Sequence, residues 1–332
     1  MRQRLDENYL ASKYQLDPNQ VVILRYYQDL FRGEPGDNDH YRALLKFVED
    51  NDVSDQQNYE TVQTLMDTDN FIDYQAAEIY FANTDWPLNN IRYWRYKTEE
   101  YNPDALPGQD GRWRWMLFDT DAGFGLLDKN RSYDHNTFKE AEDPVTSIGF
   151  LFSSLLENEA FKFQFINTFA DHLNTSFDEQ RVLDRIDQIQ NELQPQMEEH
   201  IRRWRTMDDS IDVWKQNVEK LREFARIRPN VVRQQIIERF NLPGIATLIL
   251  QTDSEKGYIQ VNSIPITADT PGVIDTGNWS GIYFMDVPVQ ITAIPKPGYQ
   301  FTGWEGLEQD QASLILNLKE DVTLRANFTA LP

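Results

Sequence analysis

Two short segments carry side chains whose types and order suit phosphate chemistry. Asp85 and Asn90 stand five residues apart in the string Asn-Thr-Asp-Trp-Pro-Leu-Asn-Asn, and Asp119 and Asp121 open the acidic turn Asp-Thr-Asp-Ala-Gly-Phe-Gly further along the chain. Phosphoryl transfer needs a carboxylate that orients or deprotonates the attacking hydroxyl. It also needs amide or carboxylate oxygens that hold a divalent cation against the phosphates. The two segments supply both kinds of group.

The spacing of the first pair equals the Asp-to-Asn spacing in the catalytic loop of protein kinases, where a metal-binding turn with glycine also follows. Spacing alone leaves a structural role open, because such a pair arises by chance in an acidic sequence. Asp85 could end a helix ahead of Pro87. Asp119 and Asp121 could cap a turn after a strand. The longer strings around these residues decide between the two interpretations.

Helical periodicity surrounds the two segments. Apolar residues recur at three- and four-residue spacing in 38–51, 57–66 and 70–83, and Asp or Asn is available to cap the first and third. Between 91 and 119 the pattern changes to runs rich in aromatic and β-branched residues around a loop of turn formers, which predicts a strand pair or hairpin. Helical periodicity returns after residue 145. The sequence therefore predicts a helix-rich unit that carries a short hairpin.

The character of the chain changes at Asn-Leu-Pro-Gly, residues 241–244. A Pro-Gly pair after a long helix ends that helix and opens a new element. Residues 245–332 then show short alternating runs separated by turn residues, which are typical of a small β domain. We therefore predict an α+β chain, with a first domain over residues 1–242 and a small all-β domain over 245–332.

Composition excludes several classes of function. The 54 acidic against 32 basic side chains give a formal net charge of −22, which repels nucleic acid and anionic lipid. The absence of cysteine excludes disulfides, thiolate catalysis and Cys-ligated zinc. The histidines lie far apart without the spacing of a zinc protease; they are His40, His135, His172 and His200.

No apolar stretch approaches the roughly 18 to 20 residues that a membrane helix needs. The N-terminal residues Met-Arg-Gln-Arg-Leu-Asp-Glu lack the apolar core of a signal peptide. The protein is therefore expected to be cytoplasmic, or the chain begins downstream of its leader.

Three strings together make the sequence specific. Residues 83–90 follow the pattern Asn-x-Asp-x-x-x-Asn-Asn after a helix, Asn-Ile-Arg-Tyr-Trp-Arg-Tyr-Lys gives a strand with aromatic and Arg residues, and Trp-Arg-Trp-Met-Leu-Phe-Asp-Thr-Asp-Ala-Gly-Phe-Gly ends at Gly125. In this order they resemble the CotH (spore coat protein H) kinase family. The resemblance covers about residues 2–240 and is strongest over 71–125. It implies a kinase-like C-terminal lobe.

The resemblance also assigns roles to the two segments. Asp85 matches the catalytic aspartate, and Asn90 matches a metal-binding or loop-bracing amide. Asp119 and Asp121 match the acidic pair that coordinates metal, and Asp121 is the stronger candidate because Ala-Gly-Phe-Gly follows it. The implied cofactors are ATP and Mg²⁺, or Mn²⁺ in its place.

Nucleotide contacts are expected from the catalytic segment as well. The residues implied are Trp86, Asn89 and Asn90. Trp113 and Trp115 could also wall a nucleotide site, although aromatic residues in a hairpin usually pack in a core.

The chain departs from the family in one respect. The small lobe, with the basic residue that holds the α and β phosphates, has no counterpart here, and neither GxGxxG nor GxxxxGK[ST] occurs to replace it. We therefore expect this chain alone to transfer phosphate poorly or not at all, and the same sequence with an upstream lobe to transfer it.

The C-terminal part resembles a second family. The run Val-Pro-Val-Gln-Ile-Thr-Ala-Ile-Pro-Lys-Pro-Gly-Tyr-Gln-Phe-Thr-Gly-Trp-Glu-Gly, followed by Val-Thr-Leu-Arg-Ala-Asn-Phe, is similar to the bacterial repeat module related to the internalin B repeat. Such modules imply an extracytoplasmic bacterial protein, secreted or on the cell surface, and attachment through the module. Trp304 could bind a surface ligand, although a core position is the commoner role for such a residue.

The sequence thus supports a leading hypothesis and two alternatives. The leading one is an atypical protein kinase-like phosphotransferase that moves phosphate from ATP to Ser or Thr of a secreted or surface protein. The first alternative is a non-catalytic extracytoplasmic surface or binding protein with a divalent-metal site. The second is a carbohydrate-associated binding protein, suggested only by the aromatic content.

Overall fold

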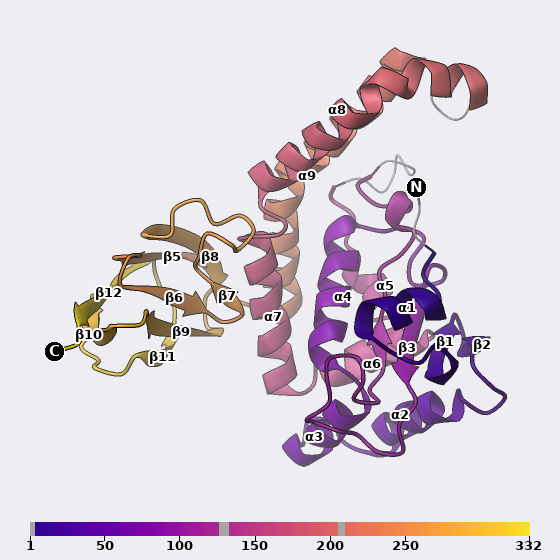
Figure 1. Ribbon diagram of the computed structural model, residues 1–332, viewed down its shortest axis with the longest axis horizontal. Coiled ribbons are helices and arrows are strands. Elements are labelled where there is room, and N and C mark those ends of the chain that lie inside the picture. Colours follow the sequence, from indigo (N-terminus) through magenta and orange to yellow (C-terminus); the bar gives the residue numbers. More distant parts are fainter. Residues whose placement is uncertain (1–3, 126–132, 205–209) are drawn as a thin grey trace. The chain divides into compact units, whose positions relative to one another are not determined.

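The computed structural model describes residues 4–125, 133–204 and 210–332 (Figure 1). The chain forms two compact units, Met1–Lys162 and Phe163–Pro332. Secondary structure changes from helix to strand where the sequence predicts it, since helix α9 ends at Phe240 and strand β5 begins at Ile245. The compact units divide at a different place, within helix α7 (Glu159–Leu173), and the predicted domains over 1–242 and 245–332 stay a prediction.

The first unit contains a four-stranded antiparallel sheet in the order β2-β1-β3-β4. The hairpin predicted between 91 and 119 is present as β3 and β4, with Tyr93 opposite Trp115. Strand β1 pairs with the other edge of β3 along the whole length of β1, from Val21 opposite Tyr96 to Arg25 opposite Arg92. The strands are β1 (Val21–Arg25), β2 (Asp29–Arg32), β3 (Arg92–Tyr96) and β4 (Arg114–Trp115).

Helices α3 and α4 of the first unit begin at side-chain caps, whereas Asn38, which the sequence offers as a cap, makes no such hydrogen bond at the start of α2. Asp67 accepts a hydrogen bond from the backbone N–H of Asn70 at the start of α4, and Asp55 does the same for α3 through Gln57 and Asn58. Helix α4 is buried on most of its surface and contacts β4 and α5. The helices are α1 (Glu7–Tyr14), α2 (Asp39–Asp50), α3 (Gln56–Leu65), α4 (Thr68–Phe81), α5 (Phe138–Ala141) and α6 (Ser147–Leu155), with 3₁₀ turns at Pro18–Gln20 and Thr120–Ala122.

Aromatic rings join the sheet to the helices. Tyr41 of α2 lies 4.4 Å from the ring of Tyr93 and 5.3 Å from that of Trp113. Phe71 of α4 lies 4.4 Å from Trp115. These side chains are buried, so Trp113 has a packing role.

A buried ion pair braces the hairpin loop. Arg114 donates to both carboxylate oxygens of Asp110, at 2.7 and 2.6 Å, and lies 2.8 Å from Asp67. Burial works to raise the pKa of Asp110, but the hydrogen bonds and charge of Arg114 outweigh it and lower that pKa to about 2.

Arg114→Leu should therefore lower the free energy of unfolding of the first unit by about 3–5 kcal/mol, because it leaves buried carboxylates without their main partner. Guanidinium denaturation measures the loss. Arg42→Ala, which removes an exposed partner of Asp39, is the control and should change it by less than about 1 kcal/mol. Equal effects of the two substitutions would contradict a stabilising role for the buried pair.

The second unit contains a long helical hairpin. Helices α8 and α9 lie side by side over much of their length (Figure 1). Ile201, Trp214 and Val218 form a small apolar cluster between them, and Arg222 of α9 pairs with Asp187 of α8 at 2.6 Å. The helices are α7 (Glu159–Leu173), α8 (Glu179–Trp204) and α9 (Ile211–Phe240).

The C-terminal strands form two four-stranded sheets that pack together, in the orders β10-β12-β5-β8 and β11-β9-β6-β7. Neither includes a strand from before residue 245. Trp304 is buried beside Phe301 and donates to the Gln311 carbonyl at 3.0 Å, which gives it a core role. The strands are β5 (Ile245–Thr252), β6 (Gly257–Val261), β7 (Ile264–Pro265), β8 (Asn278–Phe284), β9 (Pro288–Pro295), β10 (Tyr299–Glu305), β11 (Ser313–Asn317) and β12 (Val322–Ala330).

Helix α7 is fastened to these sheets by a buried carboxylate. Asp171 accepts hydrogen bonds from Asn262 Nδ2 at 3.2 Å, from the Ser263 N–H at 3.2 Å and its hydroxyl at 2.7 Å, and from the Tyr283 hydroxyl at 3.0 Å. Burial raises the pKa of Asp171 to about 6 against the effect of these donors. The carboxylate is thus mostly ionised at neutral pH, and it ties α7 to the turn between β6 and β7 and to β8.

Candidate active site

The segment that carries Asp85 begins where α4 ends. Ala82 takes the left-handed conformation with φ of 50° and closes the helix, and the chain then turns back over residues 83–90. Asn89 Nδ2 donates to Asp85 Oδ1 at 2.7 Å, and Asn90 Nδ2 donates to Oδ2 at 2.9 Å. Each oxygen of the Asp85 carboxylate is therefore held by one amide of its own loop.

Asn90 also joins this loop to the acidic turn. Its Nδ2 group donates to the backbone carbonyl of Asp119 at 3.1 Å as well as to Asp85. Thr84 adds two contacts to the Ala122 carbonyl, from its N–H at 3.3 Å and its hydroxyl at 3.2 Å. The structure thus brings together two segments that are about thirty residues apart in the sequence. Because Nδ2 makes both contacts, the Oδ1 atom of Asn90 is the one that a metal would take.

The acidic turn is a single 3₁₀ turn between Asp119 and Gly123. Asp119 has a φ of 56°, a left-handed conformation that Asp tolerates better than most residues. Gly123 lies against backbone, and a Cβ there would meet the carbonyl oxygens of Phe81 and Thr120 at 3.0 Å each. A glycine after Ala122 is therefore needed for the close approach between this turn and the end of α4.

A cavity of about 530 Å³ opens beside this turn. Asp119 and Asp121 line it together with two cationic residues, Arg4 and Arg92. Arg92 begins strand β3, and its guanidinium lies between two rings, 4.3 Å from the centre of Phe118 and 4.4 Å from that of Phe31. The remaining lining residues are Leu5, Phe118 and Thr120.

The guanidinium of Arg92 is held in place by more than its rings. Its Nη1 atom donates to the backbone carbonyl of Leu5 at 2.8 Å. Burial lowers the pKa of Arg92, and the charges of Arg25 and Arg4 lower it further. An arginine side chain keeps its charge at neutral pH in proteins. The cavity therefore offers fixed positive charge next to two carboxylates.

Sequence reasoning placed an Arg-containing strand after the catalytic loop but assigned no site role to Arg4 or Arg92. The sequence-based prediction had no basic residue to bind the phosphates. The structure places Arg4 and Arg92 in the same cavity as Asp119 and Asp121. The available signal was an Arg at the head of the strand that follows the catalytic loop. Pairing of that strand with β1, which brings the N-terminal residues near, could not be read from local pattern.

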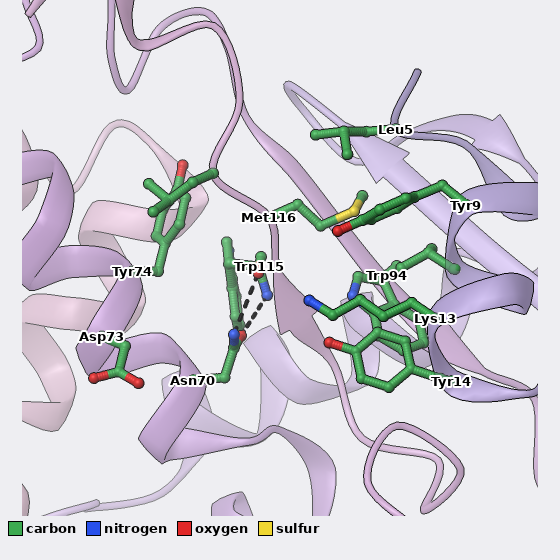
Figure 2. A pocket seen from close by; sticks show the side chains of 12 residues that line it. Leu5, Tyr9, Lys13, Tyr14, Asn70, Asp73, Tyr74, Trp94, Trp115 and Met116 are labelled. Carbon is green, nitrogen blue, oxygen red and sulfur yellow. Dashed lines mark hydrogen bonds between the residues drawn. The ribbon is translucent and has the colours of Figure 1, made fainter. Parts of the chain in front are cut away.

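A second cavity of about 310 Å³ shares Leu5 with the first (Figure 2). Tyr9, Lys13 and Tyr14 of α1 form one wall, and the amine of Lys13 points into the space between α1 and α4. The facing wall comes from Asn70, Asp73 and Tyr74 of α4, and the floor from Trp94, Trp115, Met116 and Leu117.

Asn70 fixes the strand that leads from this second cavity to the acidic turn. Its side chain accepts from the Trp115 N–H at 2.6 Å and donates to the Trp115 carbonyl at 3.3 Å, the two dashed contacts of Figure 2. Trp86 lines neither cavity, since it is buried and donates from Nε1 to the Tyr74 hydroxyl at 2.9 Å. Its predicted contact with a nucleotide stays a prediction that this packing does not support.

The metal prediction rests on Asp119, Asp121 and Asn90. Within residues 4–125, 133–204 and 210–332, no group of three or more His, Asp or Glu side chains is arranged to hold a metal ion. Mg²⁺ usually takes one or two carboxylates, substrate phosphates and several waters. Two carboxylates and one amide oxygen fit such an ion in chemical type, so the assignment remains a prediction.

Two family models match the chain. The model described as CotH kinase protein matches residues 4–232, and the model described as divergent InlB B-repeat domain matches residues 262–332. None of the curated proteins compared matches it. The first match spans more than half of the chain and includes both the loop around Asp85 and the acidic turn. This chain therefore belongs to the CotH kinase family and carries a divergent InlB B-repeat domain in its C-terminal part.

Proposed function

We propose that the protein is an atypical protein kinase-like phosphotransferase that moves phosphate from ATP to a Ser or Thr hydroxyl of a secreted or surface protein. One observation carries the proposal. Asn90 ties the Asp85 carboxylate to the acidic turn, beside a cavity lined by Asp119, Asp121 and two arginines. Carboxylates for a metal, cations for phosphates and a separate fixed carboxylate are the groups that this reaction uses.

Asp85 supplies the carboxylate that faces the acceptor. It orients the substrate hydroxyl and accepts the proton as the hydroxyl oxygen bonds to the γ-phosphorus and the bond to the β–γ bridging oxygen breaks, leaving ADP. Asn89 and Asn90 keep this carboxylate in one orientation without neutralising it. ATP supplies the phosphoryl group when bound, and Mg²⁺ or Mn²⁺ would offset part of its charge beside Asp119 and Asp121.

The arginines reduce the electrostatic repulsion between this acidic site and a polyphosphate. In a chain with a net charge of −22, a carboxylate-lined site repels the polyphosphate it must bind. Arg92 places positive charge next to Asp119 and Asp121, and Arg4, which is exposed and pairs with Asp6 at 3.2 Å, adds to it; an arginine can offer phosphate two parallel N–H donors. This arrangement favours nucleotide binding by the chain itself.

The test is transfer of radiolabel from γ-labelled ATP to the protein and to added proteins, with Mg²⁺ and after its removal by EDTA. It is run on this chain and on the chain extended by an upstream lobe, because this chain alone is expected to transfer phosphate poorly or not at all. Asp121→Asn should lower transfer by about 10²-fold or more, because the metal then loses a charged ligand. Asp50→Asn, in an exposed pair with Lys46, is the matched control and should have no effect. Undiminished transfer in Asp121→Asn would remove the metal role. Metal binding without any transfer would favour the non-catalytic metal-binding surface protein.

Arg92→Met should raise the KM for ATP by about tenfold, since a guanidinium–phosphate hydrogen bond with charge contributes about 1.5–3 kcal/mol. Steady-state kinetics at saturating acceptor measure the change. Arg25→Met removes an exposed arginine on the neighbouring strand that does not line the cavity, and should leave KM within twofold. An unchanged KM in Arg92→Met would show that phosphates bind elsewhere.

An extracytoplasmic location is part of the proposal. It rests on the C-terminal match to the InlB B-repeat model, whose resemblance implies secretion or surface attachment. Among the helices that the structure describes, none combines the length and apolarity needed to cross a membrane. Fractionation of cells that express the full-length gene product tests the location.

A further inference from the structure

Glu78 is a buried carboxyl group beneath the catalytic segment. It lies near the end of α4 with 0% of its surface exposed, in a helix whose buried side chains are otherwise apolar or aromatic apart from Thr68 and Gln75. Its Oε2 atom accepts a hydrogen bond from Asn83 Nδ2 at 2.8 Å. Asn83, also fully buried, is the second residue after the helix ends.

Two paths lead from the neighbourhood of Glu78 to the catalytic segment; one ends at the backbone N–H of Asp85 and the other at the indole of Trp86. On the first, Asn83 accepts from the backbone N–H of Asp85 through Oδ1, at 3.3 Å. On the second, Tyr74 lies one helical turn before Glu78, and its hydroxyl accepts from Trp86 Nε1 at 2.9 Å, while Oε1 of Glu78 makes no hydrogen bond among the described residues. The carboxyl group is therefore hydrogen-bonded to Asn83, which holds the Asp85 N–H, and lies one helical turn from Tyr74, which holds the Trp86 indole.

Among the described residues, no cation acts on this carboxyl group. Burial raises the pKa of Glu78 to about 8, and the groups that act against burial are the Asn83 amide and the Tyr74 hydroxyl, both neutral. A buried acid of this kind is held in its protonated form at neutral pH. Its function is therefore that of a neutral hydrogen-bonding group in the core.

We infer that Glu78 is a positioning residue for the transfer proposed above: through Asn83 on one side and through Tyr74 and Trp86 on the other, it fixes the backbone that presents Asp85. The inference rests on the proposed function for its catalytic consequence. Its structural part, the fixing of residues 83–86, stands on the contacts alone.

Ionisation of Glu78 should release this segment. Above pH 8 the group would carry an uncompensated charge in the core, and the surrounding loop would open to hydrate it. Transfer by the wild type should then fall on the alkaline side, with an apparent pKa near 8. Glu78→Gln keeps an acceptor for Asn83 and cannot ionise, so it should retain activity at pH 7 and lose this alkaline decline.

The experiment compares hydrogen exchange of the peptide spanning 82–90, and steady-state kinetics, in the wild type, Glu78→Gln and Glu78→Leu. Glu78→Leu should exchange about tenfold faster in this peptide and lose about tenfold in kcat, with the KM for ATP within twofold. Gln75→Leu is the matched control on the same helix. Gln75 is also fully buried, and its amide has no hydrogen bond among the described residues, so it should change neither measurement in the segment.

The two proposals fail in different ways. If no form of the protein transfers phosphate, the proposed function fails, while exchange in residues 82–90 still decides the role of Glu78. Wild-type exchange in a folded Glu78→Leu variant would overturn that role. Should Glu78→Leu not fold, the wild type and Glu78→Gln remain. Identical exchange of the segment in these two proteins from pH 7 to 9, after the rise common to all amides is subtracted, would equally overturn it.

Discussion

Asp85→Asn should lower the rate of phosphate transfer by about 10²–10⁴-fold, the usual contribution of a positioned general base. The substitution preserves size and removes both the charge and the proton acceptor. It also places an amide N–H₂ group against the Nδ2 donor of Asn89 or Asn90, so one of the two contacts that orient the side chain is lost. The KM for ATP should stay within a few-fold, because Asp85 does not line the cavity that holds the arginines.

The same kinetics separate the base from the metal ligands. Asp121→Asn should raise the Mg²⁺ concentration needed for half-maximal transfer, whereas Asp85→Asn should leave that concentration unchanged and lower only kcat. Asn89→Ala removes a single contact to the carboxylate and should cost about tenfold at most. A rate in Asp85→Asn equal to that of the wild type would exclude Asp85 as the base and leave it the structural role that its position before Pro87 also permits.

The catalytic segment could be predicted from sequence patterns that involve only neighbouring residues. The apolar periodicity of α4 and the aromatic strands β3 and β4 bracket the loop, and their signals depend only on neighbours in sequence. The order of Asp85, Asn90 and the acidic turn was therefore readable. Their contact through Asn90 was implied by family resemblance, and the structure supplies its geometry.

The features that the sequence missed depend on pairing between distant segments. Strand β1 was not predicted, and its register with β3 brings residues 4 and 5 beside Arg92. Glu78 was overlooked for a related reason. Helix α4 also carries Asp69 and Asp73, which are exposed, and an acidic residue in such a helix reads as a surface position unless the burial of the whole helix is known. Both cases show tertiary context deciding the role of a charged residue.

Helix α7 is the clearest case of such context. Its sequence predicts a helix but gives no sign that Asp171 faces the C-terminal sheets rather than solvent. The carboxylate is 3% exposed and accepts hydrogen bonds from three residues, Asn262, Ser263 and Tyr283. A buried acid with several donors holds α7 to the C-terminal sheets within the compact unit Phe163–Pro332.

Asp171→Ala should lower the free energy of unfolding of that unit by about 3–5 kcal/mol. The substitution leaves the Ser263 N–H and hydroxyl, the Asn262 amide and the Tyr283 hydroxyl facing a cavity, and each buried unsatisfied donor costs about 1–3 kcal/mol. Because the chain has two units and need not unfold in one step, hydrogen exchange in strands β6 and β8 is a better measure than a single melting curve.

The matched control is Asp178→Ala. Asp178 is the exposed acceptor for the backbone N–H of Arg181 at the start of α8, and removal of such a helix cap costs about 1 kcal/mol. Its effect should be confined to exchange near the start of α8. If Asp171→Ala accelerates exchange in β6 and β8 no more than Asp178→Ala does, the module is held to α7 by its apolar packing and not by the buried carboxylate. If the acceleration extends through both sheets, the carboxylate is the contact on which the docking of the repeat module depends.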